Sequence, residues 1–209
     1  MDSTDKLIEI SHELQAIASA GRLYTKNKFE KERYERVLEL SAELLTIGVD
    51  GIDRKQAIDL FEKNDGYQTP KTETRAVILN EKDEVLLVKD HDGKWALPGG
   101  WCEYNLTIRE NTIKEAREEC GLTVEPWRLV AVHFHRKRNN PDSFFSGFKY
   151  FVLCKNLGGS FEANIETTES AYFPLQGLPE DLNTHKGTPE QIALCIKAAH
   201  EEYWEPEID

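Results

Sequence analysis

Hydrophobic residues recur at helical spacing along the first part of the chain. An apolar residue every three or four positions gives a helix one face that can pack against a neighbour. One such stripe ends near Gly21, a second ends near Gly48, and residues 56–61 carry a short third one. The pattern predicts a helical N-terminal domain over residues 1–66. Its two longer stripes consist of Leu7, Ile10, Leu14, Ile17 and Ala18, and of Tyr34, Val37, Leu38, Ser41, Leu44 and Leu45.

The second part of the chain, residues 67–209, changes to short apolar or alternating runs that are typical of strands. A charged turn at 80–83 separates the first two runs, and residues 136–143 interrupt two later ones. From Thr188-Pro189 onward the helical spacing returns, with proline at a permitted early position, so we expect a C-terminal helix. Residues 65–71 read as the linker between the two parts. The predicted strands are 74–79, 84–88, 129–135 and 147–153.

The segment from Gly99 to Leu122 holds a glycine turn followed by an acidic helix. Thr107 and Glu110 have the spacing of a capping box, and Gly121 can supply the left-handed residue that ends a helix. The expected helix therefore covers residues 108–120. At roughly 100° per residue it turns Ile113, Ala116 and Cys120 to one face and Glu115, Glu118 and Glu119 to the opposite face.

Three carboxylates on one helix face indicate either a solvated surface or a bound cation, because like charges at this spacing destabilise a helix. An acidic surface is the ordinary explanation in a chain with 38 acidic and 26 basic residues. The preceding Gly99-Gly100 changes the balance, since glycines let the backbone approach a ligand and offer carbonyl oxygen beside the carboxylates. Hard oxygen ligands of this kind suit Mg²⁺ or Mn²⁺.

The segment resembles the signature of the Nudix hydrolases, Gly-x5-Glu-x7-Arg-Glu-U-x-Glu-Glu-x-Gly-U, in which U is aliphatic. Gly100 takes the first glycine, Glu115 the glutamate after the arginine, and Gly121 the final glycine. Two positions depart from the pattern, because Leu106 replaces the first glutamate and Lys114 replaces the arginine. In the family these two residues usually form a salt bridge, and losing both leaves no orphan charge.

The resemblance implies an α/β/α sandwich around a mixed sheet and an enzyme that hydrolyses a nucleoside diphosphate linked to a moiety X. It also implies divalent cations that neutralise the phosphates and activate a water. Their expected ligands are Gly99, through its carbonyl, with Glu115, Glu118 and Glu119, of which Glu118 and Glu119 are also catalytic candidates. The family often takes a general base from a later loop, where Glu166 is the first candidate and Glu169 the second.

The helical part and the segment 66–71 resemble one bacterial Nudix branch, the ADP-ribose and CDP-choline pyrophosphatases that carry a helical N-terminal domain. A unit of this size buries little by itself, so we expect it to lean on the catalytic domain or to support a homodimer. Nothing in the signature selects X. A quaternary ammonium is best held by aromatic faces and nearby acid. Trp101 and Tyr104 flank the glycine turn, so CDP-choline is favoured over ADP-ribose.

Further substrate contacts are expected from the early strand and from a basic patch. Arg75 stands where the family often reaches the pyrophosphate. His133, His135 and Arg136 lie together where a strand becomes a loop, and such a patch can hold phosphate or simply offset surrounding acid. Without a third ligand the two histidines are better substrate contacts or surface residues than a metal pair.

The composition limits the remaining function classes. A net charge of −12 argues against broad binding to nucleic acid, since phosphate backbones need a basic footprint, although short RNA stays open. No apolar run is long enough to span a membrane, and the four cysteines lack metal or redox spacing, so a cytoplasmic enzyme with reduced thiols is expected. An RNA-end pyrophosphohydrolase and a non-catalytic nucleotide sensor remain as alternatives to a small-molecule pyrophosphatase.

Overall fold

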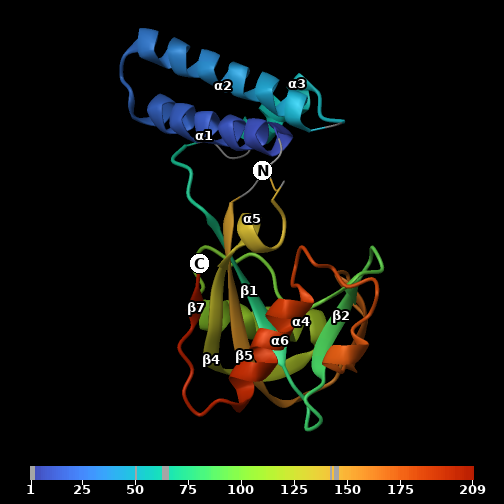
Figure 1. The fold of residues 1–209 in the computed structure, drawn as a ribbon. Helices are drawn as coiled ribbons and strands as arrows, with labels where there is room; N and C mark the ends of the chain where they lie inside the picture. The colour runs from blue at the N-terminus through green and yellow to red at the C-terminus, as the bar shows by residue number, and fades with distance from the viewer. Residues whose placement is uncertain (1–2, 50, 63–65, 142, 144–145) are drawn as a thin grey trace. The chain divides into compact units, whose positions relative to one another are not determined.

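The computed structural model describes residues 3–49, 51–62, 66–141, 143 and 146–209. Its chain divides into a helical unit that ends at Thr69 and a larger unit that begins at Pro70 (Figure 1). Asp65, the first residue of the predicted linker, lies outside the described residues. Within the described part of the chain, no helix is long and apolar enough to cross a membrane.

The helical unit consists of α1 (Ser3–Tyr24), α2 (Lys28–Gly48) and α3 (Arg54–Glu62). The long helices α1 and α2 pack against each other, and Ile8 of α1 joins residues of α2 and α3 in one small core, whereas Ile10 and Ile17 of the predicted α1 stripe are exposed. α1 does not end at Gly21 but continues to Tyr24. A side chain at Gly21 would collide with the ring of Tyr34, so this glycine allows close packing of the two helices. The buried core residues are Ile8, Ala42, Leu45, Ala57 and Phe61.

Two sheets form the larger unit. A four-stranded mixed sheet has the order β1-β5-β4-β7, with β1 parallel to β5 and β5 antiparallel to β4. A three-stranded antiparallel sheet has the order β3-β2-β6. The strands are β1 (Lys71–Ile78), β2 (Val85–Asp90), β3 (Trp95–Ala96), β4 (Leu122–Phe134), β5 (Gly147–Gly159), β6 (Thr167–Phe173) and β7 (Glu207–Ile208).

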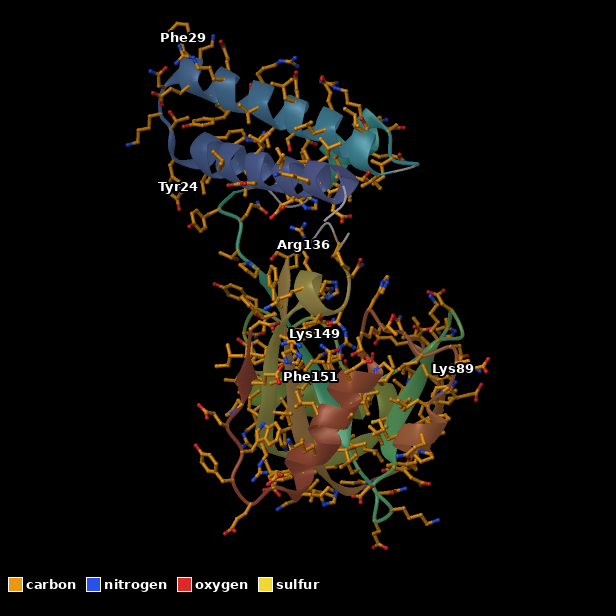
Figure 2. The ribbon with its side chains drawn as sticks, viewed as in Figure 1. Tyr24, Phe29, Lys89, Arg136, Lys149 and Phe151 are labelled. Atoms are coloured by element: carbon orange, nitrogen blue, oxygen red, sulfur yellow. The ribbon has the colours of Figure 1, made fainter. Side chains whose placement is uncertain are left out.

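Helices cover both faces of the mixed sheet. Side chains alternate along β5, so Val152 joins the core under α4 (Ile108–Cys120), whereas Phe151 joins the core under α6 (Pro189–His200). Lys149 and Phe151 lie together in the sheet of this unit (Figure 2). The mixed α/β fold predicted from the sequence is confirmed.

Some local structure differs from the sequence prediction. β4 starts at Leu122, directly after the glycine that ends α4, and it stops at Phe134, so His135 begins the short helix α5 (His135–Arg138). Gly158 and Gly159 pair with β4 at the end of β5. A side chain on Gly159 would meet the carbonyl of Gly121, so close approach of the two backbones requires a glycine here.

Candidate active site

The glycine loop is hydrogen-bonded along the edge of β1. The amides of Thr74 and Ala76 donate to the carbonyls of Gly100 and Pro98, at 3.0 and 2.8 Å. Gly99 has a φ of 143°, and a side chain there would lie 2.0 Å from the carbonyl oxygen of Thr74. Only glycine fits so close to the strand, which explains why the sequence places two glycines before the acidic helix.

The acidic helix α4 is held at both ends as the sequence predicts. The amide of Thr107 donates to the carboxylate of Glu110 at 2.9 Å, and the amide of Glu110 donates to the Thr107 hydroxyl at 3.2 Å. Gly121 ends the helix with a φ of 68°. The predicted bounds 108–120 are therefore confirmed, and the orientation of the carboxylates follows from them.

Glu115 and Glu119 face the glycine loop. Oε2 of Glu119 accepts a hydrogen bond from the Gly99 amide at 2.7 Å. Burial raises the pKa of Glu119 to about 7, even though the Gly99 amide and the charge of Arg75 oppose the shift. The pKa of Glu115 is also raised, by burial first and by repulsion from Glu118 and Glu166, against the pull of Lys114. Two carboxylates whose charged forms are disfavoured by burial are suited to a cation, which favours the charged form.

Glu118 points to another group. Its carboxylate bonds the ammonium of Lys114, which also lies 3.2 Å from Glu103. The hydrogen bond that Lys114 donates to Glu118 outweighs burial and raises the pKa of Lys114. Lys114 therefore ties α4 to the loop through Glu103, three residues before the position where the family signature has its glutamate.

A charged cluster on the sheet lies on the other side of the glycine loop. Glu73 and Arg75 project from β1, and Lys149 stands opposite Glu73 on β5. The Arg75 guanidinium bonds Glu73 at 2.5 Å and also donates to the carbonyl of Gly99. Burial alone would raise the pKa of Glu73, but the charges of Arg75 and Lys149 hold it well below its ordinary value. Arg75 thus braces the glycine loop.

A cleft of about 510 Å³ lies between these carboxylates and the charged cluster. Its lining includes seven of the residues proposed from the sequence, which come from β1, the glycine loop, α4, α5 and the segment before β6: Arg75, Gly99, Trp101, Glu115, Glu119, His135 and Glu166.

Five other proposed residues do not line this cleft. Tyr104 is fully exposed, and Glu169 on β6 pairs with Lys89 at 3.1 Å. His133 is buried with Nε2 3.0 Å from Glu207 and Nδ1 3.0 Å from Gln191, so both ring nitrogens are occupied inside the protein. The remaining two are Glu118, described above, and Arg136, whose Nε lies 3.4 Å from the carbonyl of Pro141.

Sequence reasoning missed six of the residues that line the cleft. Lys149 could have been noticed as a lone charge in an apolar strand, whereas Glu73 looked like an ordinary strand residue. The segment before α6 gave no signal in the sequence, because only the tertiary fold brings it to the cleft. There the amide of Asn183 donates to the carbonyl of Trp95 at 2.7 Å. The lining residues missed are Glu73, Lys94, Lys149, Asn183, His185 and Lys186.

The donor set fits a hard divalent cation. Among the described residues no three His, Cys, Asp or Glu side chains form a ready metal cluster. Two buried carboxylates with raised pKa values nevertheless face one cleft, beside the carbonyl of Gly99. Glu115, Glu119 and this carbonyl would hold the cation, which would supply charge neutralisation and an acidified water.

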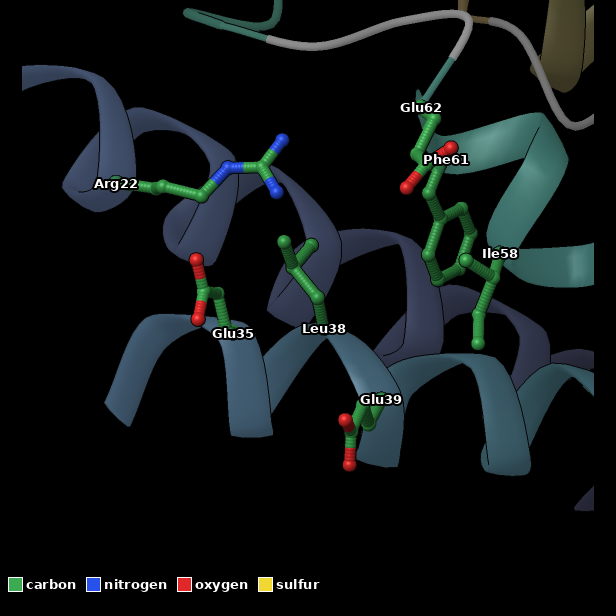
Figure 3. A pocket seen from close by; sticks show the side chains of 7 residues that line it. All are labelled: Arg22, Glu35, Leu38, Glu39, Ile58, Phe61 and Glu62. Atoms are coloured by element: carbon green, nitrogen blue, oxygen red, sulfur yellow. The ribbon is translucent and has the colours of Figure 1, made fainter. Parts of the chain in front are cut away.

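A separate hollow lies within the helical unit (Figure 3). It measures about 290 Å³ and is lined from α1, α2 and α3. The lining combines apolar side chains with three glutamates and one arginine. The lining residues are Arg22, Glu35, Leu38, Glu39, Ile58, Phe61 and Glu62.

Comparison with known families agrees with this geometry. Residues 69–194 match the model of the NUDIX domain, and residues 5–61 match that of the UDP-X-like N-terminal oligomerisation domain. The chain is a Nudix hydrolase. Nudix enzymes are pyrophosphohydrolases that act on small nucleotide derivatives with divalent cations. The family assignment therefore accounts for the carboxylates of α4 and for the glycine loop together.

Individual Nudix relatives cover most of the chain. The Bacillus subtilis protein YjhB, provisionally named an ADP-ribose pyrophosphatase, is 36% identical over 191 residues, which are 91% of each chain. The crystal structure of an ADP-ribose pyrophosphatase from Streptococcus suis is 46% identical, with a TM-score of 0.63, over 68% of this chain and 100% of that one. A UDP-X diphosphatase structure is 29% identical, with a TM-score of 0.62, over the full length of both chains.

Proposed function

We propose that this Nudix enzyme hydrolyses the diphosphate of a nucleoside diphosphate linked to a sugar, with Mg²⁺ or Mn²⁺ held by Glu115, Glu119 and the carbonyl of Gly99. The observation that carries the proposal is the division of the cleft into two walls. Carboxylates from α4 form one wall, and Arg75 with Lys149 belongs to the cationic cluster on the other. Bound cations and this cluster would together neutralise a diphosphate, which otherwise repels a nucleophile.

Glu166 is the proposed general base. It lies directly before β6 and lines the same cleft as Glu115 and Glu119, and its charge contributes to the raised pKa of Glu115. Glu169 is the weaker candidate, because it pairs with Lys89 outside the cleft. Glu118 is a weaker candidate for a metal ligand than Glu115 and Glu119, because its carboxylate accepts a hydrogen bond from Lys114. A general base must reach the water it activates, and Glu166 meets that requirement best.

As the substrate we favour ADP-ribose over CDP-choline, so that X is ribose. The preference for CDP-choline depended on Trp101 and Tyr104 forming an aromatic site, but Tyr104 is fully exposed and does not line the cleft. Lys94 and Lys186 lie in the lining, where positive charge would repel a quaternary ammonium and favour hydroxyl or phosphate groups. The names of the Bacillus subtilis and Streptococcus suis relatives agree with ribose as X.

The helical unit is proposed to form a homodimer interface. Ile10 and Ile17 on α1 are exposed seven residues apart, and so are Leu40 and Ile47 on α2. This spacing puts each pair on one face of its helix, which leaves apolar surface that a second copy would bury. The match to an N-terminal oligomerisation domain supports assembly through this unit.

A product assay with the full-length chain tests the reaction and X together. ADP-ribose, CDP-choline, UDP-glucose and a 5′-triphosphorylated short RNA are each incubated with Mg²⁺ or Mn²⁺, and released nucleoside monophosphate or phosphate is measured. We expect the highest kcat/KM for ADP-ribose, with AMP and ribose 5-phosphate as products. A clear preference for CDP-choline would identify X as choline instead of ribose, and a preference for RNA would change the substrate class. No release from any compound would overturn the proposed function.

A further inference from the structure

Lys149 is completely buried, although lysine is seldom found in a protein interior. The strand register places it between Glu73 on β1 and His133 on β4. Its ammonium bonds the carboxylate of Glu73, and its Nζ lies 2.9 Å from Nδ1 of His135. A buried charge is retained only with partners, and these two groups provide them. Lys149 is therefore a fixed donor aimed at one nitrogen of His135.

This contact determines which nitrogen of His135 carries hydrogen. An ammonium has three donors and no acceptor, so Nδ1 has to accept, and the hydrogen of a neutral imidazole then sits on Nε2. The opposite tautomer would direct an Nδ1 hydrogen at the ammonium 2.9 Å away. Its acceptor would be Oε1 of Glu73, which is farther, at 3.4 Å, and is already bonded by Lys149.

Nε2 is the nitrogen of His135 that is left to contact a ligand in the cleft, because Nδ1 is taken by Lys149. The ring lines the cleft, and no described residue bonds Nε2. A neutral N–H at this place donates without adding positive charge, so it would not repel divalent cations beside Glu115 and Glu119 as a second ammonium would. Diphosphate oxygens are acceptors only, and they are the substrate atoms that such a donor suits.

We infer that Lys149 is a positioning residue that fixes His135 in the Nε2–H tautomer, and that this N–H donates to a diphosphate oxygen of the substrate. The inference rests on the proposed function for the identity of the acceptor, but the tautomer itself does not depend on it. Lys149 acts through His135, because its buried ammonium is held by Glu73 and donates to Nδ1 of the ring. A purely structural role would require only that Lys149 neutralise Glu73.

The first test is the ¹⁵N spectrum of the full-length protein labelled at histidine, recorded at pH 7. Ring correlations show which imidazole nitrogens carry hydrogen, and a His135→Leu variant assigns the signals among the six histidines. We expect Nε2 of His135 to be protonated and Nδ1 to be bare. A protonated Nδ1, alone or together with Nε2, overturns the inference whatever the enzyme hydrolyses.

Two substitutions separate the hydrogen bond from the charge. Lys149→Met removes both, whereas the amide of Lys149→Gln can still donate to Nδ1 without a charge. In Lys149→Met we expect His135 to populate both tautomers, and KM for ADP-ribose to rise about tenfold with a smaller change in kcat. In Lys149→Gln we expect His135 to keep the Nε2–H tautomer and the enzyme to keep most of its affinity for ADP-ribose. If the two variants show the same tautomer of His135 and the same KM, Lys149 acts only by neutralising charge, and the inference is overturned.

Two further measurements complete the test. In the His135→Leu background, Lys149→Met should change KM no further, whereas additive effects would contradict action through His135. Titration of the labelled wild type with α,β-methylene-ADP and Mg²⁺ should shift the Nε2–H signal of His135, and an unmoved signal would refute the substrate contact. If Lys149→Met does not fold, the wild-type spectrum and Lys149→Gln still decide the matter, and an inactive substrate panel would reject the proposed function alone.

Discussion

The Gly99 amide donates to the Glu119 carboxylate at 2.7 Å, which joins the glycine loop to the middle of the acidic site. The same glycine offers its carbonyl to Arg75. Gly99 thus links the carboxylate wall of the cleft to the cationic cluster on the sheet, and a substitution that moves this loop would disturb both. The strict geometry of the loop follows from its contact with Thr74, where a side chain has no room.

Metal binding should stabilise the protein through Glu115 and Glu119. Burial leaves both carboxylates with raised pKa values, and a divalent cation would restore their charged forms. We expect Mg²⁺ or Mn²⁺ to raise Tm in the wild type and in Glu110→Gln, an acid outside the cleft, but not in Glu119→Gln. An equal rise in Glu119→Gln would place the cation elsewhere.

Restoring the family glutamate at position 106 should not improve the enzyme. Lys114 already has Glu103 at 3.2 Å and Glu118 as partners, so a new carboxylate finds no unpaired cation. We expect Leu106→Glu to leave kcat/KM for ADP-ribose unchanged or lower. A clear gain in turnover would show that the site lacks this carboxylate. Glu103→Gln, the matched loss, should lower Tm slightly, because exposed pairs contribute roughly 0.2–1 kcal/mol.

Acid should unfold the protein partly through Glu73. Its pKa in the folded state lies well below the ordinary 4.5, so the folded state binds fewer protons than the unfolded state at low pH. The stability that Glu73 contributes is therefore complete above pH 4.5 and is lost as the pH falls below that value. In Glu73→Gln, chemical unfolding should show a lower free energy at pH 7 and a flatter decline below pH 4.5. An unchanged decline would contradict the buried ion-pair network.

The homodimer can be measured directly. Sedimentation of the full-length chain at tens of micromolar should give about twice the chain mass of 24.0 kDa. Replacing exposed Ile17 and Ile47 by Lys should shift the sample toward monomer, whereas the same change at Ile165, an exposed residue of the larger unit, should not. A wild type that stays monomeric at this concentration would remove the dimer proposal.

Local signals made α4 and the helical unit predictable. The capping box at Thr107 and the stop at Gly121 depend on neighbouring residues alone, so the sequence contains all that determines these ends. The apolar stripes likewise predict α1 and α2, although α1 continues past Gly21. That glycine makes room for the ring of Tyr34, a residue of the next helix, and does not end α1. A contact of that kind cannot be read from local spacing.

The acidic wall of the candidate site was also predictable, whereas of the cationic side only Arg75 and His135 were proposed from the sequence. Glu115 and Glu119 share a helix face, and that face follows from the helical period. Glu73, Lys149 and His135 meet because β1 and β5 are parallel neighbours and α5 begins where β4 ends, and both facts are products of the tertiary fold. For the same reason His133 lies inside, bonded to Gln191 of α6, although it alternates with His135 in sequence.

The central claim is that Glu115 and Glu119 hold the divalent cations that allow diphosphate hydrolysis. Its most direct test is kcat for ADP-ribose with saturating Mg²⁺ in Glu119→Gln, beside Glu169→Gln as a matched carboxylate outside the cleft, with far-UV dichroism as the control for folding. The account predicts a loss of at least about a hundredfold for Glu119→Gln, by removal of transition-state charge stabilisation, and little change for Glu169→Gln. Near-normal turnover by a folded Glu119→Gln would contradict it.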